Sequence, residues 1–142
     1  MPHLEPEIKS DILQFTTKES TPKSNNQDGR AMELETTDYK RCTLIKASGR
    51  VDGLTAPKLE EAFDQITNRG VYKIVLDMTD VDFMSSAGWW VLIEAQKKSK
   101  RYNRGEIVLV NVKDRIKSSL DLVGMGSYFN IYDDVTAAVA QF

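Results

Sequence analysis

The sequence contains very few of the residues on which most catalytic and metal-binding sites depend. Its 142 residues include one histidine and one cysteine. Because His3 stands in the N-terminal tail, a Ser-His-Asp triad would lack its base, and a zinc site would lack nitrogen and sulfur ligands. Cys42 cannot form an internal disulfide, and its setting, KRCTLIKA, predicts a packed thiol in a reducing compartment. We therefore expect no enzyme, no metal and no cofactor.

Long apolar runs and an excess of positive charge are absent as well. No apolar run approaches the roughly 18 residues that a transmembrane helix needs. The first residues, MPHLEPEIKS, have acids and prolines where a signal peptide needs bases and an apolar core. The formal charge is −2 and the pI about 5.5, which argues against nucleic-acid and anionic-membrane partners. We expect a cytoplasmic protein without either partner.

The first 30 residues differ from the rest of the chain. The stretch TTKESTPKSNNQDGR (16–30) has no apolar residue and is predicted to be a disordered linker. Before it, Ile8, Ile12 and Phe15 are spaced for one or two turns of an amphipathic helix, which would be either a tail without a function of its own or a docking segment. The predicted organisation is a disordered tail over 1–30 and one domain over 31–142.

From Ala31 onward, patterns typical of strands and helices alternate. Strands are predicted at 31–36, 42–51, 71–78, 106–112 and 128–132, and helices at 54–70, 86–105, 113–124 and 133–142. The order after the opening hairpin is strand, helix, strand, helix, and right-handed crossovers make such strands parallel. The predicted fold is an α/β domain with a mixed, mostly parallel sheet of about five strands, about four helices and an antiparallel edge hairpin.

The helix at 54–70 shows its boundaries and its buried face in the sequence. Thr55 is placed to be its N-cap, and Gly70 to end it. Leu59, Ala62, Phe63 and Ile66 follow the i, i+3, i+4, i+7 spacing of a buried stripe.

Three carboxylates, Asp77, Asp80 and Asp82, follow the third predicted strand closely. Such a cluster could bind magnesium, as in phosphoryl-transfer receivers. The interpretation that we favour is that they are solvated acids of a loop. No GxGxxG or GxxxxGK[ST] pattern for a nucleotide is present.

Two adjacent serines open the tryptophan-containing helix, in the stretch VDFMSSAGWW (81–90). Ser85 and Ser86 stand where a central strand leads into a helix, which is the edge of an α/β sheet where sites form. One hydroxyl suffices as an N-cap, and Ala87-Gly88 leaves the helix start accessible. A phosphate there would be tolerated by the helix N-terminus. It would add about −1.5 to −2 charges beside Asp52 and the Asp77–Asp82 acids, as a binding switch requires.

Three stretches match one family in the order in which they occur. They are GRVDGLTAPKLEEAF (49–63), IVLDMTDVDFMSSAGWWVLI (74–93), and the C-terminal set IVLVNV (107–112) with LDLVGMGSYFNIYDDVTAAVA (120–140). Together they resemble the STAS domain, and most closely the single-domain anti-sigma factor antagonists. The resemblance covers about residues 32–142 and agrees with the predicted order of elements.

The resemblance implies a partner-switching mechanism. Such antagonists, when unphosphorylated, bind an anti-sigma factor that is also a serine kinase, and so free the sigma factor for transcription. The kinase phosphorylates a serine and reverses binding, and a metal-dependent serine phosphatase restores the active form. By position the acceptor is Ser86, with Ser85 as the alternative, and Asp52 matches the partner-contacting loop aspartate. The implied partner-binding residues are Asp52, Thr55, Ser85, Ser86, Ala87, Gly88 and Trp90.

Two departures from the family pattern bear on the site. Many members have aspartate just before the acceptor, where this chain has Ser85. After the glycine the family has leucine and then a small or basic residue, where this chain has Trp89 and Trp90. Trp89 is expected to pack inside. Trp90, about 100° further around the helix, is either core or an exposed anchor for a partner.

Two other functions remain open on the sequence. One is a non-switching STAS scaffold subunit of a stress-sensing or transport-accessory assembly. The other is a binder of small ligands or nucleotides. A switch is expected to be a monomer or a weak dimer, whereas a scaffold would form a large particle.

Overall fold

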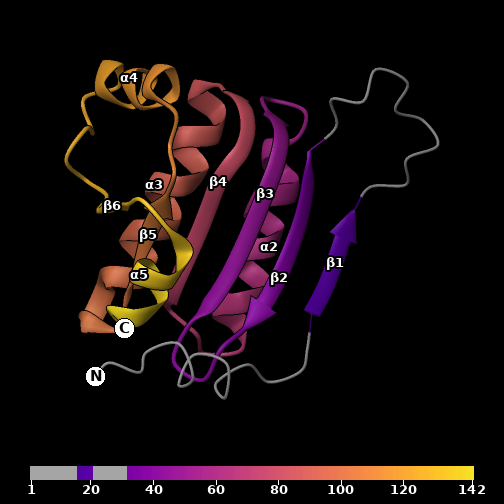
Figure 1. Cartoon of the computed structure of the whole chain (residues 1–142), viewed down its shortest axis with the longest axis vertical. Coiled ribbons are helices and arrows are strands. Elements are labelled where there is room, and N and C mark those ends of the chain that lie inside the picture. Colours follow the sequence, from indigo (N-terminus) through magenta and orange to yellow (C-terminus); the bar gives the residue numbers. More distant parts are fainter. Residues whose placement is uncertain (1–15, 21–31) are drawn as a thin grey trace.

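The structure is a computed structural model and describes residues 16–20 and 32–142. Six strands form one sheet in the order β1-β2-β3-β4-β5-β6 (Figure 1). The strands are β1 (Thr16–Ser20), β2 (Glu33–Asp38), β3 (Thr43–Val51), β4 (Lys73–Met84), β5 (Glu106–Val110) and β6 (Ile131–Tyr132). The helices are α2 (Ala56–Asn68), α3 (Ser86–Lys100), α4 (Asp114–Leu122) and α5 (Val135–Ala140), with a 3-10 turn, η2, at Arg101–Asn103.

The sheet confirms the predicted α/β architecture. The β1–β2 and β2–β3 pairs are antiparallel, and the β3–β4, β4–β5 and β5–β6 pairs are parallel. All five predicted strands are present, with a helix after each strand from β3 onward. Within the described residues no helix is long and apolar enough to cross a membrane.

The sixth strand, β1, corrects the prediction for the tail. Thr16–Ser20 pairs with β2, from Thr16 opposite Thr37 to Ser20 opposite Glu33, although this stretch was predicted to be disordered. The pairing uses backbone groups that the edge of β2 would otherwise leave open, so it needs no apolar side chain. The predicted amphipathic segment with Ile8, Ile12 and Phe15 lies outside the described residues.

Both faces of the central strand β4 are covered at Ile74–Leu76, which confirms the prediction for this strand. Ile74 and Leu76 pack into the larger core, with the buried stripe of α2 and with α3, whereas Val75 points into a second core with Ala138 of α5. Figure 1 shows α2 and α3 on one side of the sheet and α5 on the other. The predicted α2 stripe is buried at Leu59, Ala62, Phe63 and Ile66.

β4 is longer than predicted, and this places the site. The strand was expected to end at residue 78, but it continues to Met84 and pairs with β3 up to Val51 opposite Met84. Two register shifts, at Lys46/Ser48 and Gly49/Arg50, accommodate this pairing. The loop after β3 and the first turn of α3 therefore lie side by side.

Candidate functional site

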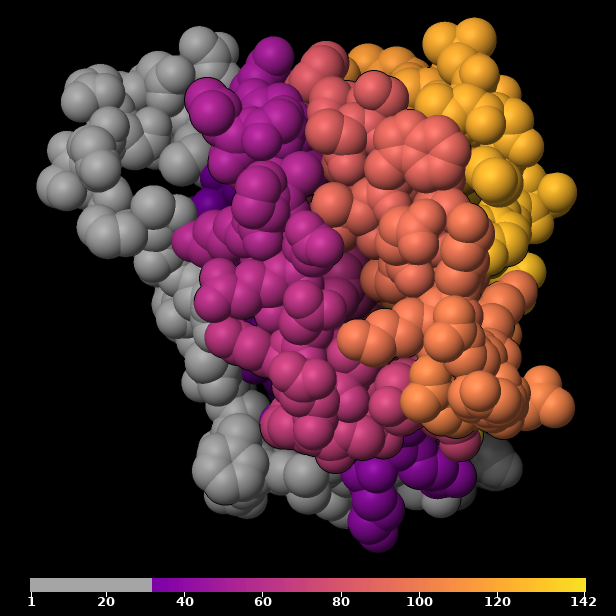
Figure 2. All heavy atoms as spheres, turned by 180° about the vertical axis from the view of Figure 1, so that it is seen from behind, coloured from indigo at the N-terminus to yellow at the C-terminus, as the bar shows by residue number. Residues whose placement is uncertain are grey.

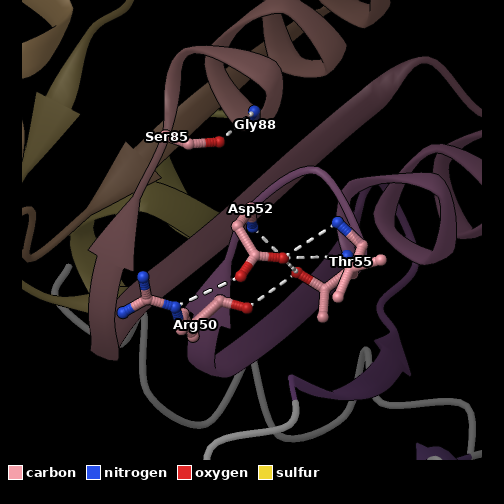
Figure 3. A network of polar contacts seen from close by, with 6 residues as sticks. Arg50, Asp52, Thr55, Ser85 and Gly88 are labelled. Atoms are coloured by element: carbon pink, nitrogen blue, oxygen red, sulfur yellow. Dashed lines mark hydrogen bonds and ion pairs between the residues drawn. The ribbon is translucent and has the colours of Figure 1, made fainter.

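The candidate site lies at the carboxyl ends of β3 and β4. The backbone N–H of Ser85 donates to the carbonyl of Val51 at 2.9 Å. This bond ties the start of α3 to the loop that begins with Asp52. Figure 3 shows Ser85 on the segment next to this loop. Asp52 and Ser85 were predicted to share a site, and the topology brings their segments together.

The loop between β3 and α2 is held by Asp52 and Thr55. The Asp52 carboxylate accepts from the N–H of Leu54 at 3.0 Å and of Thr55 at 3.2 Å. The Thr55 hydroxyl donates to the carbonyl of Arg50 at 2.7 Å and accepts from the N–H of Asp52 at 2.9 Å. Thr55 is the N-cap residue of α2, as predicted, but its side chain makes no capping bond to the helix because these contacts occupy the hydroxyl. Its role here is to shape the loop.

Arg50 and Asp52 form an ion pair beside this loop, with Nε 3.2 Å from Oδ2. The Arg50 guanidinium also stacks on the ring of Phe83, 4.1 Å from the centroid. Burial opposes ionisation of the Asp52 carboxyl group. Hydrogen bonds from the N–H groups of Leu54 and Thr55, and then from the Arg50 and Thr55 side chains, outweigh burial and lower its pKa. Asp52 is therefore a fixed negative charge next to the start of α3.

Replacing Asp52 by asparagine should lower the free energy of unfolding at neutral pH by about 1 kcal/mol. A carboxyl group whose pKa is lower in the folded state stabilises above its unfolded pKa, here near 3.8. That stability is lost as the pH falls through the folded pKa. The difference from wild type should therefore vanish in solutions more acidic than the folded pKa. Urea titrations at neutral pH and at successively lower pH measure how this difference changes.

Asp80→Asn is the matched control, because this β4 carboxylate is 55% exposed in an ion pair with Lys46. Exposed pairs contribute little, so its effect should be smaller than that of Asp52→Asn. Equal losses from both variants at neutral pH, or an Asp52→Asn loss that persists in acid, would contradict the assignment.

The two serines have different places at the start of α3. Ser85 is the N-cap, and its hydroxyl accepts from the N–H of Gly88 at a long 3.4 Å. Ser86 is the first residue of the helix, and its side chain is exposed. Because Ser85 supplies the cap, the hydroxyl of Ser86 is not needed to start the helix.

Ala87 and Gly88 also differ in position. Ala87 is half-buried, whereas Gly88 is buried against the ends of β3 and β4. A Cβ at position 88 would lie 2.6 Å from the sulfur of Met84 and 2.7 Å from Cγ1 of Val51. Gly88 was predicted to contact a partner, and in the structure its contacts lie inside the domain.

Gly88→Ala should therefore lower the free energy of unfolding by about 1 kcal/mol, the middle of the range that these two effects leave. Overpacking costs about 1–3 kcal/mol, and the better helix propensity of alanine returns about 1 kcal/mol. Gly53→Ala is the control, since a Cβ there has nothing within 4 Å. Thermal melts compare the stability of the two variants. Equal melting temperatures would contradict the prediction, because they would show that Val51 and Met84 move aside without a loss of stability.

The tryptophans lie on different sides of α3. Trp89 is fully buried, its Nε1 donates to the hydroxyl of Ser119 at 2.7 Å, and its ring lies near Phe129. This confirms the prediction that Trp89 packs inside. Trp90 is 48% exposed, so it is not part of the core.

Leu54 is a surface residue that the sequence analysis did not select. It is 91% exposed, in the loop next to Asp52. Figure 2 shows this loop and the start of α3 at the same end of the face formed by α2 and α3. The sequence could have pointed to an exposed Leu54, because this residue stands outside the periodic stripe of buried residues that begins at Leu59. Exposed Leu54, Ser86 and Trp90 together form what we call the serine edge.

The three aspartates of β4 are engaged by neighbouring side chains. Asp77 is buried and accepts hydrogen bonds from the N–H and hydroxyl of Thr79, while Asp80 and Asp82 each pair with a lysine at 3.5 Å. All three are strand residues rather than loop residues. In the described part of the chain no three acidic, histidine or cysteine side chains are placed to hold a metal ion. The described residues therefore give no support to the magnesium alternative.

Comparison with known proteins gives the family. Residues 33–138 match the STAS domain family. The chain belongs to the STAS domain family. An anti-sigma-B factor antagonist of Listeria monocytogenes is 31% identical over 101 residues, which are 71% of this chain and 87% of the relative.

Two solved structures share the fold of this STAS domain. An anti-sigma factor antagonist from Mycobacterium paratuberculosis has a TM-score of 0.69 at 21% identity, covering 80% of this chain and 95% of that one. The Bacillus cell fate determinant SpoIIAA in its phosphorylated form has a TM-score of 0.62 at 16% identity, covering 78% and 98%. The relative and both structures agree with the predicted STAS resemblance. The relative and the first structure are both named as antagonists of an anti-sigma factor, and neither name describes a catalysed reaction.

Proposed function

We propose that this STAS domain is an anti-sigma factor antagonist controlled by phosphorylation of Ser86. In its unphosphorylated form the serine edge binds an anti-sigma factor with serine kinase activity, and the sigma factor is released. The proposal rests on the different positions of the two serines at the start of α3. Ser85 caps the helix, whereas the hydroxyl of Ser86 is exposed and does not cap it.

The first turn of α3 suits a phosphate on Ser86. The N–H groups of a first helical turn have no intrahelical acceptor, and the helix dipole favours negative charge there. A phosphate would therefore leave the fold intact while adding about −1.5 to −2 charges at the surface. The Asp52 carboxylate on the neighbouring loop would strengthen the negative potential. A partner that docks on the unphosphorylated serine edge would then have to desolvate these charges, so its binding would weaken.

The rest of the serine edge suits a protein partner. Leu54, on the loop after β3, and Trp90, in the second turn of α3, are large apolar side chains that the described structure exposes on the two segments of the site. Tryptophan is over-represented among residues that dominate binding energy. We infer that Trp90 and Leu54 supply apolar contact, that Asp52, Thr55, Ser85 and Ala87 supply the polar and small surface around it, and that a metal-dependent serine phosphatase resets Ser86.

The experiment compares what tagged wild type, Ser86→Ala and Ser86→Asp proteins capture from host lysate. Wild type and Ser86→Ala should retain a protein with a kinase domain and Ser86→Asp should lose it, with circular dichroism unchanged. Incubation of the captured kinase with ATP should phosphorylate wild type, but not Ser86→Ala, at residue 86 by peptide mass spectrometry.

Other outcomes would count against the proposal. Phosphate found on Ser85 would move the switch to the capping residue. Identical partners for all three proteins, with elution as one large particle, would support the scaffold function instead.

A further inference from the structure

A groove runs between α2 and α3, on the face of the molecule that also carries the serine edge. It has a volume of about 360 Å³ and is lined by residues of both helices and by Arg101, which follows α3. Its floor is apolar, because Phe63 is buried and Val91 and Ala95 are half-buried. Figure 2 shows the two helices side by side, with a hollow along the line between them. A groove of this kind can take one row of side chains from another helix.

The groove begins at the serine edge. Four residues at the i, i+4, i+7, i+11 spacing share one face of α3 and its end, namely Trp90, Glu94, Lys97 and Arg101. The last three line the groove, and Trp90 stands one turn before them. A partner that contacts Trp90 therefore reaches the groove along a continuous surface.

The charges of the groove are ordered along its length. Because α2 and α3 each follow a strand of the parallel part of the sheet, they run in the same direction. An ion pair between Asp64 and Lys98, with Nζ 3.7 Å from Oδ1, fixes their relative height. Glu60 and Glu94 stand four residues before this pair, one turn nearer to the serine edge, and Arg101 stands three residues after Lys98. The groove is therefore acidic near the serine edge and basic at its other end.

The charges at both ends are available to a partner. Among the described residues, neither Glu60 nor Arg101 forms an ion pair. Glu94 pairs with Lys97 at 3.4 Å, and both of these side chains are exposed. Because exposed pairs contribute little to stability, a partner can take over such contacts at a small cost.

We propose that this groove binds one amphipathic helix of the kinase partner, antiparallel to α2 and α3, with acids in its N-terminal half and bases in its C-terminal half. The identity of the partner as a kinase rests on the proposed function. The basic half faces Glu60 and Glu94, and one of its cations can stack on Trp90. The acidic half faces Lys97 and Arg101. Acids near the N-terminus and bases near the C-terminus are also the order that a helix dipole favours, and only the antiparallel direction matches that order to the groove.

Two synthetic helical peptides of equal composition test the charge order without the kinase. Both carry the same apolar row at i, i+3, i+4, i+7 spacing. The first has glutamates in its N-terminal half and lysines in its C-terminal half, and the second has the reverse order. The first should shift the backbone amides of Phe63, Val91 and Ala95 and should bind more tightly than the second by a factor of about ten or more. The preference should weaken with salt, because exposed charges are screened.

A charge-swap variant tests the residues of the groove. E60K/E94K/K97E/R101E exchanges two acids and two bases at exposed positions, so the net charge stays at −2. It should prefer the second peptide. The single variant Glu60→Lys should reduce the preference for the first peptide, and it keeps the test decisive if the fourfold variant unfolds. Equal binding of the two peptides by wild type, or an unchanged preference in both variants, would overturn the proposal.

The purified kinase partner gives a second readout. The charge-swap variant should bind it more weakly than wild type by a factor of about ten or more. The control K117E/D121K exchanges two exposed charges on α4 and should bind it as wild type does. If Ser86→Asp loses the kinase while the charge-swap variant keeps it, the groove is not part of the interface and the proposed function stands. If the charge-swap variant loses the kinase while Ser86→Asp keeps it, the groove is confirmed and the Ser86 switch fails. Retention by both would overturn both.

Discussion

Trp89→Ala is expected to lower the free energy of unfolding by about 3 to 5 kcal/mol, the range for deletion of a large buried aromatic side chain. Trp89 is fully buried, and its indole N–H donates to Ser119. Its removal leaves a cavity between α3 and α4 and frees the Ser119 hydroxyl from this partner. Urea unfolding followed by circular dichroism measures the loss, and a loss of this size should lower the melting temperature of the variant strongly.

Trp90→Ala is the matched variant, because it deletes the same side chain one residue later. With 48% of Trp90 exposed, we expect a loss of about 1 kcal/mol or less. If Trp90→Ala destabilised the domain as much as Trp89→Ala, Trp90 would belong to the core and its assignment to the partner surface would fail.

Ser86→Asp is expected to weaken binding of the captured kinase partner by a factor of about 100, which corresponds to about 3 kcal/mol. The added carboxylate stands at the helix start, where the dipole tolerates it, so the stability of the domain should change little. The loss arises at the interface, where a desolvated, unpaired charge typically costs 2–5 kcal/mol. Isothermal titration of the purified pair measures the affinity.

Ser85→Ala is the control for this experiment, because it removes the neighbouring hydroxyl. The cap bond to Gly88 is lost, so the free energy of unfolding should fall by about 1 kcal/mol, while the affinity should stay within a few fold of wild type. The reverse result, in which Ser85→Ala abolishes binding and Ser86→Asp does not, would assign the switch to Ser85.

The order of elements could be predicted because each one carries a local periodicity. The stripe of Leu59, Ala62, Phe63 and Ile66 marks α2, and the apolar run at 74–76 marks a strand covered on both faces. Parallel crossovers place the ends of such strands at one edge, so the sequence also predicted that Asp52 and the serines meet. This inference needs only the direction of the strands.

The ends of the elements were less predictable. β4 continues to Met84 because the bulged end of β3 pairs with it, although Asp80 and Asp82 resemble loop residues. β1 forms because the edge of β2 supplies hydrogen-bonding partners. In both cases the deciding contact is with a strand distant in sequence, and local patterns do not carry that information.

The sequence by itself determined the family, the order of strands and helices, and the short stretch that holds the serines and tryptophans, since these depend on residue types and spacing. Only the tertiary structure decided that Ser85 caps α3 and Ser86 is exposed, and that Trp89 is core and Trp90 is surface. Each of these depends on which neighbours cover a side chain, and those neighbours come from strands and loops brought together only by the fold.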